Sequence, residues 1–309
     1  MQFQKTIKDK IELSGIALHS GQAVSIIISP SKADSGIVFI RGDIESRPEI
    51  KATWNNVVDT ELSTVLGNKD GVKVATVEHL LSALKGLGID NAVVEVFGNE
   101  LPILDGSAAV YVDAINKVGI EAQDKPVKYI QVVKPVSVHI DDRFVYLLPA
   151  KDLKVTCRVN YKNPNIGLQH LEYCDNSFAY TNNISKAKTF GFLEQVEDLQ
   201  KRGFALGGSY ENAIVLNSEG VVNKNNMNYE DEFVRHKILD IMGDISLAGP
   251  TRLIAHVVAY KSGHKLHTLV VKELFERATC FKIVEEPIAV DEKAFAEEVF
   301  SLLDPISSL

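Results

Sequence analysis

Cysteine is scarce in this sequence: its 309 residues include only Cys157, Cys174 and Cys280, and no two of them form a C-x-x-C pair. An odd, widely spaced set indicates neither a disulfide framework nor a thiolate zinc site, and it is typical of a reducing compartment. A signal peptide is also lacking, because residues 1–5 lead at once into alternating polar and apolar positions. We therefore expect a cytoplasmic protein.

Long apolar runs and an excess of basic charge are absent too. No run approaches the roughly 18 apolar residues of a membrane-spanning helix. The net charge is −8 and the sequence pI is about 5.6, which argues against a nucleic-acid partner because such a partner favours a basic face. With 45% hydrophobic and 24% charged residues, the composition is that of an ordinary globular chain. We expect a soluble monomer that meets any lipid from the water side.

What the sequence does contain is two successive runs of short strands, each followed by helices. The first run occupies residues 5–66, and the second begins at residue 129. Between them, residues 121–127 are polar and contain Pro126, which is typical of a boundary. The length permits two domains of about 150 residues, which we predict at 1–123 and 128–309. The strand-then-helix order predicts the α+β class.

One predicted helix follows Thr76, a candidate N-cap, and ends at Gly86 or Gly88. Its buried stripe consists of Val77, Leu80, Leu81, Leu84 and Leu87. Glu78 and His79 lie in the first turn, off that stripe. An acid beside an imidazole at a helix start is common on protein surfaces. The alternative is a metal-ligating histidine with a neighbouring carboxylate that can act as a base.

A second helix is predicted over residues 230–244. Its apolar face is formed by Val234, Ile238, Ile241, Met242 and Ile245. His236, Lys237, Asp240 and Asp244 gather on the other face, within an arc of roughly 100°. His236 and Asp240 stand four residues apart and can bind one cation together. The alternative is a solvated polar face with an internal ion pair.

Two loop histidines and one further unit are also candidates. His19 lies in a loop between two predicted strands, and His264 follows the strand run 253–260 on a glycine turn, where catalytic side chains are often displayed. Either one could equally be an exposed loop residue. Residues 188–216 form a separate unit whose helix carries Leu193, Val196 and Leu199 on one stripe. Periodicity alone favours an ordinary helix packed on its own sheet.

Taken together, these segments supply the parts of a catalytic metal site. His79, His236 and Asp240 are the candidate ligands. Two imidazoles and one carboxylate, with a fourth position left for water, form a catalytic zinc pattern, although iron(II) can use the same ligands. Glu78, beside the first ligand, is placed to act as the general base.

An acid and an oxyanion donor complete the set. His264 could donate a proton to a leaving amine, with Asp244 orienting the imidazole and keeping it cationic. Thr189 could donate a hydrogen bond to a developing oxyanion. These roles describe metal-assisted hydrolysis of an amide, but spacing along the chain does not establish that the groups converge.

Five segments resemble the signature segments of one family: 76–80 (TVEHL), 104–108 (LDGSA), 188–192 (KTFGF), 233–240 (FVRHKILD) and 261–264 (KSGH). That family is the UDP-3-O-acyl-N-acetylglucosamine deacetylases, zinc amidases that commit a sugar nucleotide to lipid A synthesis in Gram-negative bacteria. The match runs in order from about residue 5 to about residue 275. It implies two similar two-layer α/β sandwich domains with the active site between them, and a β-α-β insertion at about residues 192–216.

The resemblance implies the same metal ligands, base and acid, and it adds an acylated UDP-sugar as the substrate. Lys237 and Lys261 would contact the diphosphate, Tyr161 would stack near the uracil, and His19 would lie at the rim of the site. An apolar passage in the insertion would hold the acyl chain. The substrate-binding residues implied for that segment are Phe190, Phe192, Leu193, Val196, Leu199 and Val215.

The predicted reaction is hydrolysis of the N-acetyl group of UDP-3-O-(3-hydroxyacyl)-N-acetylglucosamine, which releases acetate and a free amine. Two rival functions stay open. A metallohydrolase for another amide, such as a peptide, would not need the phosphate-facing lysines or the acyl passage. A non-catalytic nucleotide-sugar or lipid-binding protein would have no use for both Glu78 and His264.

Overall fold

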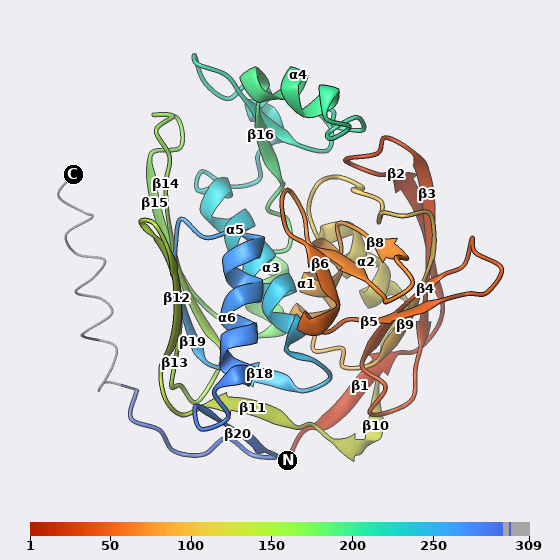
Figure 1. The fold of residues 1–309 in the computed structure, drawn as a ribbon, viewed down its shortest axis with the longest axis vertical. Coiled ribbons are helices and arrows are strands. Elements are labelled where there is room, and N and C mark those ends of the chain that lie inside the picture. Colours follow the sequence, from red (N-terminus) through yellow and green to blue (C-terminus); the bar gives the residue numbers. More distant parts are fainter. Residues whose placement is uncertain (293–296, 298–309) are drawn as a thin grey trace.

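The two halves of the chain each form a five-stranded sheet, and helices fill the space between the two sheets. A computed structural model describes residues 1–292 and residue 297. Figure 1 shows the second-half sheet on the left, the first-half sheet on the right, and α1, α5 and α6 between them. Each sheet therefore covers one side of a shared helical layer.

The two sheets have the same strand arrangement. The order in the first is β2 (Ile11–Ile16), β3 (Ala23–Pro30), β9 (Ala92–Phe97), β4 (Ile37–Arg41) and β5 (Glu49–Lys51). The order in the second is β12 (Val136–Ile140), β13 (Arg143–Leu148), β19 (His256–Tyr260), β14 (Lys154–Asn160) and β15 (Leu168–Cys174). In each sheet the central strand, β9 or β19, is antiparallel to one neighbour and parallel to the other.

The helices repeat as well. In the first half, α1 (Glu78–Gly86) comes before the central strand and α2 (Ala109–Val118) comes after it. In the second half, α5 (Glu232–Ile245) and α6 (His264–Glu276) take the same places around β19. The predicted α+β class with two similar halves is confirmed, and the repetition lies in the topology.

Smaller sheets and helical segments lie outside the two five-stranded sheets. A two-stranded sheet pairs β1 (Phe3–Ile7) with β10 (Ile120–Pro126), and a three-stranded sheet contains β11 (Tyr129–Val132), β18 (Arg252–Ile254) and β20 (Phe281–Val284). A second three-stranded sheet contains β6 (Val57–Asp59), β7 (Val65–Gly67) and β8 (Lys73–Val74). Further helical segments are α3 (Ser177–Asn183), η1 (Trp54–Asn56), η2 (Lys224–Asn226) and η3 (Ser246–Ala248).

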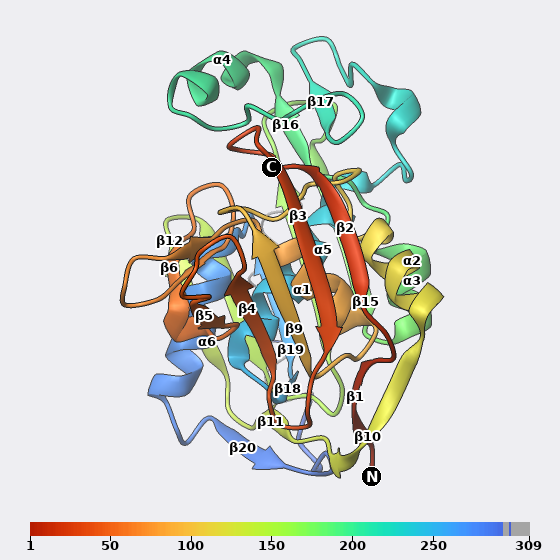
Figure 2. The same cartoon turned by 90° about the vertical axis from the view of Figure 1, so that its right-hand side faces the viewer.

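A β-α-β unit projects beyond the sheets at one end of the molecule, as Figure 1 and Figure 2 both show. It consists of β16 (Phe190–Phe192), α4 (Leu193–Lys201) and β17 (Ile214–Leu216), and the two strands pair in parallel. This unit corresponds to the insertion expected at about residues 192–216.

The sequence pattern explains the burial of the helical layer. The five residues predicted for the apolar face of α5 have no exposed surface: Val234, Ile238, Ile241, Met242 and Ile245. The opposite face is buried too, since His236, Asp240 and Asp244 are at most 2% exposed. The solvated polar face considered for this helix is therefore wrong, because α1 and α6 pack against it.

The structure differs from the sequence analysis at the start of α1, at α6 and at the predicted domain boundary. Thr76 does not cap α1, because its φ is +57° and its hydroxyl donates to Glu100 instead. The helix α6 was not predicted from the sequence. Most of the segment predicted as a domain boundary forms strand β10, so the division at 123 and 128 stays a prediction.

Among the described residues, no helix combines the length and the hydropathy needed to cross a bilayer.

Candidate active site

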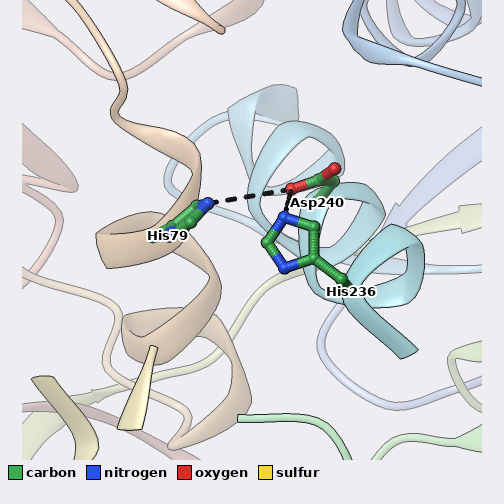
Figure 3. Close-up of side chains that lie close together, drawn as sticks. All are labelled: His79, His236 and Asp240. Atoms are coloured by element: carbon green, nitrogen blue, oxygen red, sulfur yellow. Dashed lines mark ion pairs between the residues drawn. The ribbon is translucent and has the colours of Figure 1, made fainter. Parts of the chain in front are cut away.

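Helices from different halves bring the three predicted metal ligands together. Figure 3 shows His79 on α1 facing His236 and Asp240 on α5, and their ligand atoms lie within 4.8 Å of one another. Asp240 Oδ1 lies 3.4 Å from His236 Nε2 and 4.0 Å from His79 Nε2. Two ligands of a tetrahedral metal at about 2.1 Å stand about 3.4 Å apart, so this spacing fits one shared cation.

Both imidazoles are buried and are available as neutral ligands. His236 Nδ1 can donate to the carbonyl oxygen of Ala187 over 3.0 Å, which leaves Nε2 to face Asp240. His79 Nδ1 is buried and has no hydrogen-bond partner among the described residues, unlike an ordinary core histidine. Burial lowers the pKa of His79 to about 3 and also lowers the pKa of His236. Neutral imidazole is the form that binds a metal.

Asp240 stays ionised although it is almost fully buried. Burial alone would raise the pKa of its carboxyl, but His236 and Lys237 hold that pKa well below its usual range. Lys237 Nζ donates to Asp240 Oδ2 over 2.6 Å and lies 5.5 Å from the centroid of the Phe190 ring. One carboxylate oxygen thus faces the imidazoles, and the other holds the ammonium group.

Glu78 stands beside this cluster at the start of α1. Its Oε2 accepts a hydrogen bond from the backbone N–H of Thr64 over 3.1 Å, and its Oε1 lies 3.8 Å from His264 Nε2. Burial raises the pKa of Glu78 to about 8, although the charge of His264 lowers it. A carboxyl whose pKa lies near the working pH suits a general base.

His264 is the first residue of α6 and is held by α5. Its Nδ1 donates to Asp244 Oδ2 over 2.8 Å. Burial lowers the pKa of His264, but Asp244 and Glu78 outweigh burial and raise it to about 10. Asp244 is fully buried, which would raise its pKa, yet His264 holds that pKa well below its usual range. The imidazole is therefore cationic at neutral pH.

An apolar cavity of about 470 Å³ lies between α4, β16 and the first-half loop that contains His19. Its lining includes all six residues predicted for the acyl passage: Phe190, Phe192, Leu193, Val196, Leu199 and Val215. His19, Tyr161, Thr189 and Lys237 also line it. The stripe of α4 therefore faces this space and not a sheet of its own.

Thr189 enters the apolar cavity from a fixed backbone. Its N–H donates to the carbonyl of Gly106, and its carbonyl accepts from the N–H of Ile214, both over 2.8 Å. Gly106 has a φ of +85°, and a Cβ at that position would stand 1.9 Å from the carbonyl oxygen of Asn212. The glycine of the LDGSA segment therefore allows the two chain segments to approach closely.

A polar cleft of about 610 Å³ opens on the other side of Lys237. It is lined by His264, Lys265 and Arg143 among others, and it shares Leu62 and Lys237 with the apolar cavity. Lys261 lines neither space and donates instead to Asp142 over 2.6 Å. The structure thus gathers all but one of the predicted site residues around the two spaces and the metal cluster.

Two residues that sequence reasoning missed also contact the site. Thr64 Oγ1 donates to Asp244 Oδ1 over 2.5 Å, and His267 Nδ1 lies 2.7 Å from Asp244 Oδ2. The i, i+3 spacing of His264 and His267 was the only signal for the second residue. Thr64 lies 180 residues from its partner, and no local pattern marks it.

Three candidate metal ligands beside a buried carboxyl group and a cationic imidazole form an arrangement typical of one class, the metal-dependent hydrolases. A family model described as UDP-3-O-acyl N-acetylglycosamine deacetylase matches residues 4–276. The chain belongs to this family, so the resemblance seen in the sequence is confirmed.

Individual relatives agree with the family model. A protein named UDP-3-O-acyl-N-acetylglucosamine deacetylase from Geobacter sp. (strain M21) is 45% identical over 287 residues, which cover 92% of this chain and 93% of that protein. Proteins of the same name from Syntrophotalea carbinolica and Shewanella piezotolerans are each 42% identical, over 92% of this chain and 92% and 93% of theirs. The similarity therefore extends over nearly the whole of each chain.

Proposed function

We propose that this chain hydrolyses the N-acetyl group of UDP-3-O-(3-hydroxyacyl)-N-acetylglucosamine, the committed step of lipid A synthesis, with a metal held by His79, His236 and Asp240. The observation that carries this proposal is the convergence of those ligands with Glu78 and His264 beside an apolar cavity. The relatives are named as deacetylases of the same class of substrate. We place the reaction in the cytoplasm, on a soluble enzyme.

The donor set supports zinc, and iron(II) fits the same ligands. When bound, the metal would supply Lewis-acid polarisation of the amide carbonyl and would lower the pKa of a coordinated water. A cation among these ligands would also favour the ionised form of Glu78, whose pKa burial raises to about 8.

The residues of the chain would then divide the proton transfers between them. Glu78 would take a proton from the attacking water, because its carboxylate is next to the ligand His79 in the chain and is fixed by the N–H of Thr64. His264 would give its proton to the departing nitrogen, since its Nε2 faces Glu78 across 3.8 Å. Thr189 would donate a hydrogen bond to the developing oxyanion.

The two spaces that meet at Lys237 support the substrate assignment. The apolar cavity would hold the acyl chain, with His19 at its rim and Tyr161 nearer the nucleoside. Lys237 would contact the diphosphate. Burial lowers the pKa of Lys237, but Asp240 and Tyr161 outweigh burial and raise that pKa above the ordinary lysine value, so the side chain is cationic. Lys261 would need to leave Asp142 to join it, which an exposed ion pair permits at small cost.

The test is an acetate-release assay on the purified protein with the acylated UDP-sugar, after chelation and after addition of Zn²⁺ or Fe²⁺. We expect activity to disappear on chelation and to return with metal. Glu78→Gln should bind Zn²⁺ as before but lose activity by about 10²- to 10⁴-fold, the usual contribution of a general base. The exposed Glu276→Gln should behave as the parent protein.

Three outcomes would contradict the proposal. A fully active Glu78→Gln variant would remove Glu78 as the base. Turnover of acetylated peptides in place of the sugar nucleotide, or binding of the sugar nucleotide without turnover, would favour one of the rival functions.

A further inference from the structure

Asp244 is held by three donors, of which the proposed chemistry uses only one. Thr64 Oγ1 donates to Oδ1 over 2.5 Å, while His264 Nδ1 and His267 Nδ1 approach the same Oδ2 at 2.8 and 2.7 Å. Neither Asp244 nor His267 has any exposed surface. The carboxylate is thus shared between the acid and a second, completely buried imidazole.

His267 is itself fixed at its other nitrogen. Its Nε2 lies 2.8 Å from Ser262 Oγ, and its backbone N–H donates to the carbonyl of Gly263 over 3.1 Å. A neutral imidazole that donates from Nδ1 to Asp244 and accepts from the Ser262 hydroxyl satisfies both ring nitrogens. Both histidines therefore lie in the first turn of α6, where Asp244 contacts both rings and Ser262 contacts His267.

A second metal does not explain this cluster. Two ligands that share a tetrahedral metal stand about 3.4 Å apart. The two contacts to Asp244 Oδ2 are 2.7 and 2.8 Å long, which is the range of a hydrogen bond to an ionised acceptor. His79, His236 and Asp240 show the wider spacing instead.

We propose that His267 is a positioning residue for the acid of this reaction: its Nδ1–H fixes Asp244 Oδ2 in the orientation that aims His264 Nε2 at the reacting amide. The inference rests on the proposed function, in which His264 protonates the departing nitrogen. Asp244 is free to turn about its side-chain torsions unless both oxygens are held. Thr64 holds one oxygen, and His267 holds the other independently of His264, so the acid returns to the same place after each proton transfer.

Three substitutions of His267 separate this role from simple packing. His267→Asn keeps an amide N–H close to the place of Nδ1, and His267→Gln extends its amide toward Ser262 and away from Asp244. His267→Leu fills a similar volume without any donor. We expect kcat for Asn within about threefold of the parent, and kcat for Gln and Leu reduced about tenfold or more, which is the effect of losing a hydrogen bond to a charged group. KM should be unchanged in all three variants, because His267 lines neither the apolar cavity nor the polar cleft.

A second readout does not depend on activity. In metal-free protein labelled with ¹⁵N-histidine, the Nδ1–H resonance of His264 should persist in the parent and in His267→Asn and should be lost to exchange in His267→Leu. Thermal unfolding of each variant shows whether it is folded, and if Leu fails to fold, the comparison of Asn with Gln still decides.

The inference is overturned if Leu or Gln keeps the parent kcat and the His264 resonance, or if Asn is as damaged as Leu. A parent protein that releases no acetate would instead overturn the proposed function. The resonance of His264 in the variants would still test the role of His267 in that case.

Discussion

Gly243 of α5 lies against the backbone of Glu78 in α1: a Cβ on Gly243 would stand 2.2 Å from the Glu78 carbonyl oxygen and 2.8 Å from its carbonyl carbon. Gly243 is three residues after Asp240, and Glu78 is next to His79. This close approach of the two helices therefore lies beside the place where ligands from the two halves meet. The absence of a side chain at one position sets the distance between them.

Gly243→Ala should weaken both the fold and the metal site. Alanine favours a helix over glycine by about 1 kcal/mol, so the substitution would stabilise α5 if there were room. Since the methyl group meets a backbone that cannot move aside, we expect a net loss of about 1–3 kcal/mol in the free energy of unfolding and weaker Zn²⁺ binding. Urea unfolding and zinc titration measure the two effects, with Lys272→Ala on the exposed face of α6 as the control. Raised stability with unchanged zinc affinity would show that the helices do not depend on this contact.

The pair of Asp244 and His264 predicts a pH dependence. Burial lowers the pKa of His264, but Asp244 and Glu78 raise it to about 10, so in the parent the imidazole stays protonated through neutral pH and loses its proton only as the pH approaches 10. Asp244→Asn removes the larger of the two charges that outweigh burial, so the pKa of His264 should fall toward its ordinary value of about 6.5.

The basic limb of the pH–rate profile should therefore move to lower pH in Asp244→Asn. At pH 8 a group with a pKa of about 6.5 is only about 3% protonated, so the rate should fall by about 30-fold or more. Asp124→Asn, an exposed acid on β10, is the matched control. If the basic limb of the variant profile coincides with that of the parent, Asp244 does not set the pKa of the group that acts as the acid.

Local pattern was enough to predict most of the elements that carry the site. The apolar spacing of α5 was predicted correctly, because all five residues of that face are fully buried. The same spacing did not reveal that the polar face of α5 is buried, because the elements that cover it come from elsewhere in the chain. Thr76 illustrates the same limit: it was predicted to cap α1, but its hydroxyl donates a hydrogen bond to Glu100.

The pairings around Asp244 show what sequence could not supply. His264 was assigned to Asp244 on chemical grounds, and the structure places them 2.8 Å apart. His267 was missed because α6 itself was not predicted, and Thr64 was missed because its contact depends on the packing of the two halves. Local rules thus predict which groups are present, while tertiary packing decides which of them share a partner.

A bidentate ion pair between Arg252 and the buried Asp90 joins the two halves. Arg252 at the start of β18 donates from Nε and Nη2 to both oxygens of Asp90 at 2.7 and 2.8 Å, and Nη2 also donates to the carbonyl of Gly88 at 2.9 Å. The side chain of Asp90 is 3% exposed. Its charge therefore depends on this arginine for compensation.

Arg252→Ala should cost about 3–5 kcal/mol of unfolding free energy, because it leaves the buried carboxylate uncompensated. Arg252→Lys keeps the charge but loses the two-pronged geometry, so we expect an intermediate loss. The control is Arg277→Ala, whose partner Glu273 lies one turn away on the exposed surface of α6 and which should cost less than about 1 kcal/mol. Equal unfolding midpoints in urea for the Arg252 and Arg277 variants would mean that the ion pair of Arg252 and Asp90 does not stabilise the fold.

Leu199 tests whether the apolar cavity holds the acyl chain. It lies on α4 and lines the cavity of about 470 Å³ together with Leu193 and Val196. A tryptophan there would fill part of the space, so Leu199→Trp should shift the preference toward shorter acyl chains. Each methylene that can no longer be buried should lower kcat/KM about fourfold, the equivalent of about 0.8 kcal/mol.

The measurement is kcat/KM for a series of substrates that differ only in acyl length. Gln200→Trp places the same side chain one residue further along α4, at an exposed position outside the lining of the cavity, and should leave the preference unchanged. If both variants keep the parent preference, the acyl chain does not enter this cavity, and the stripe of α4 serves the packing of the unit alone. If only Leu199→Trp shifts it, the apolar cavity sets the length of acyl chain that the enzyme accepts.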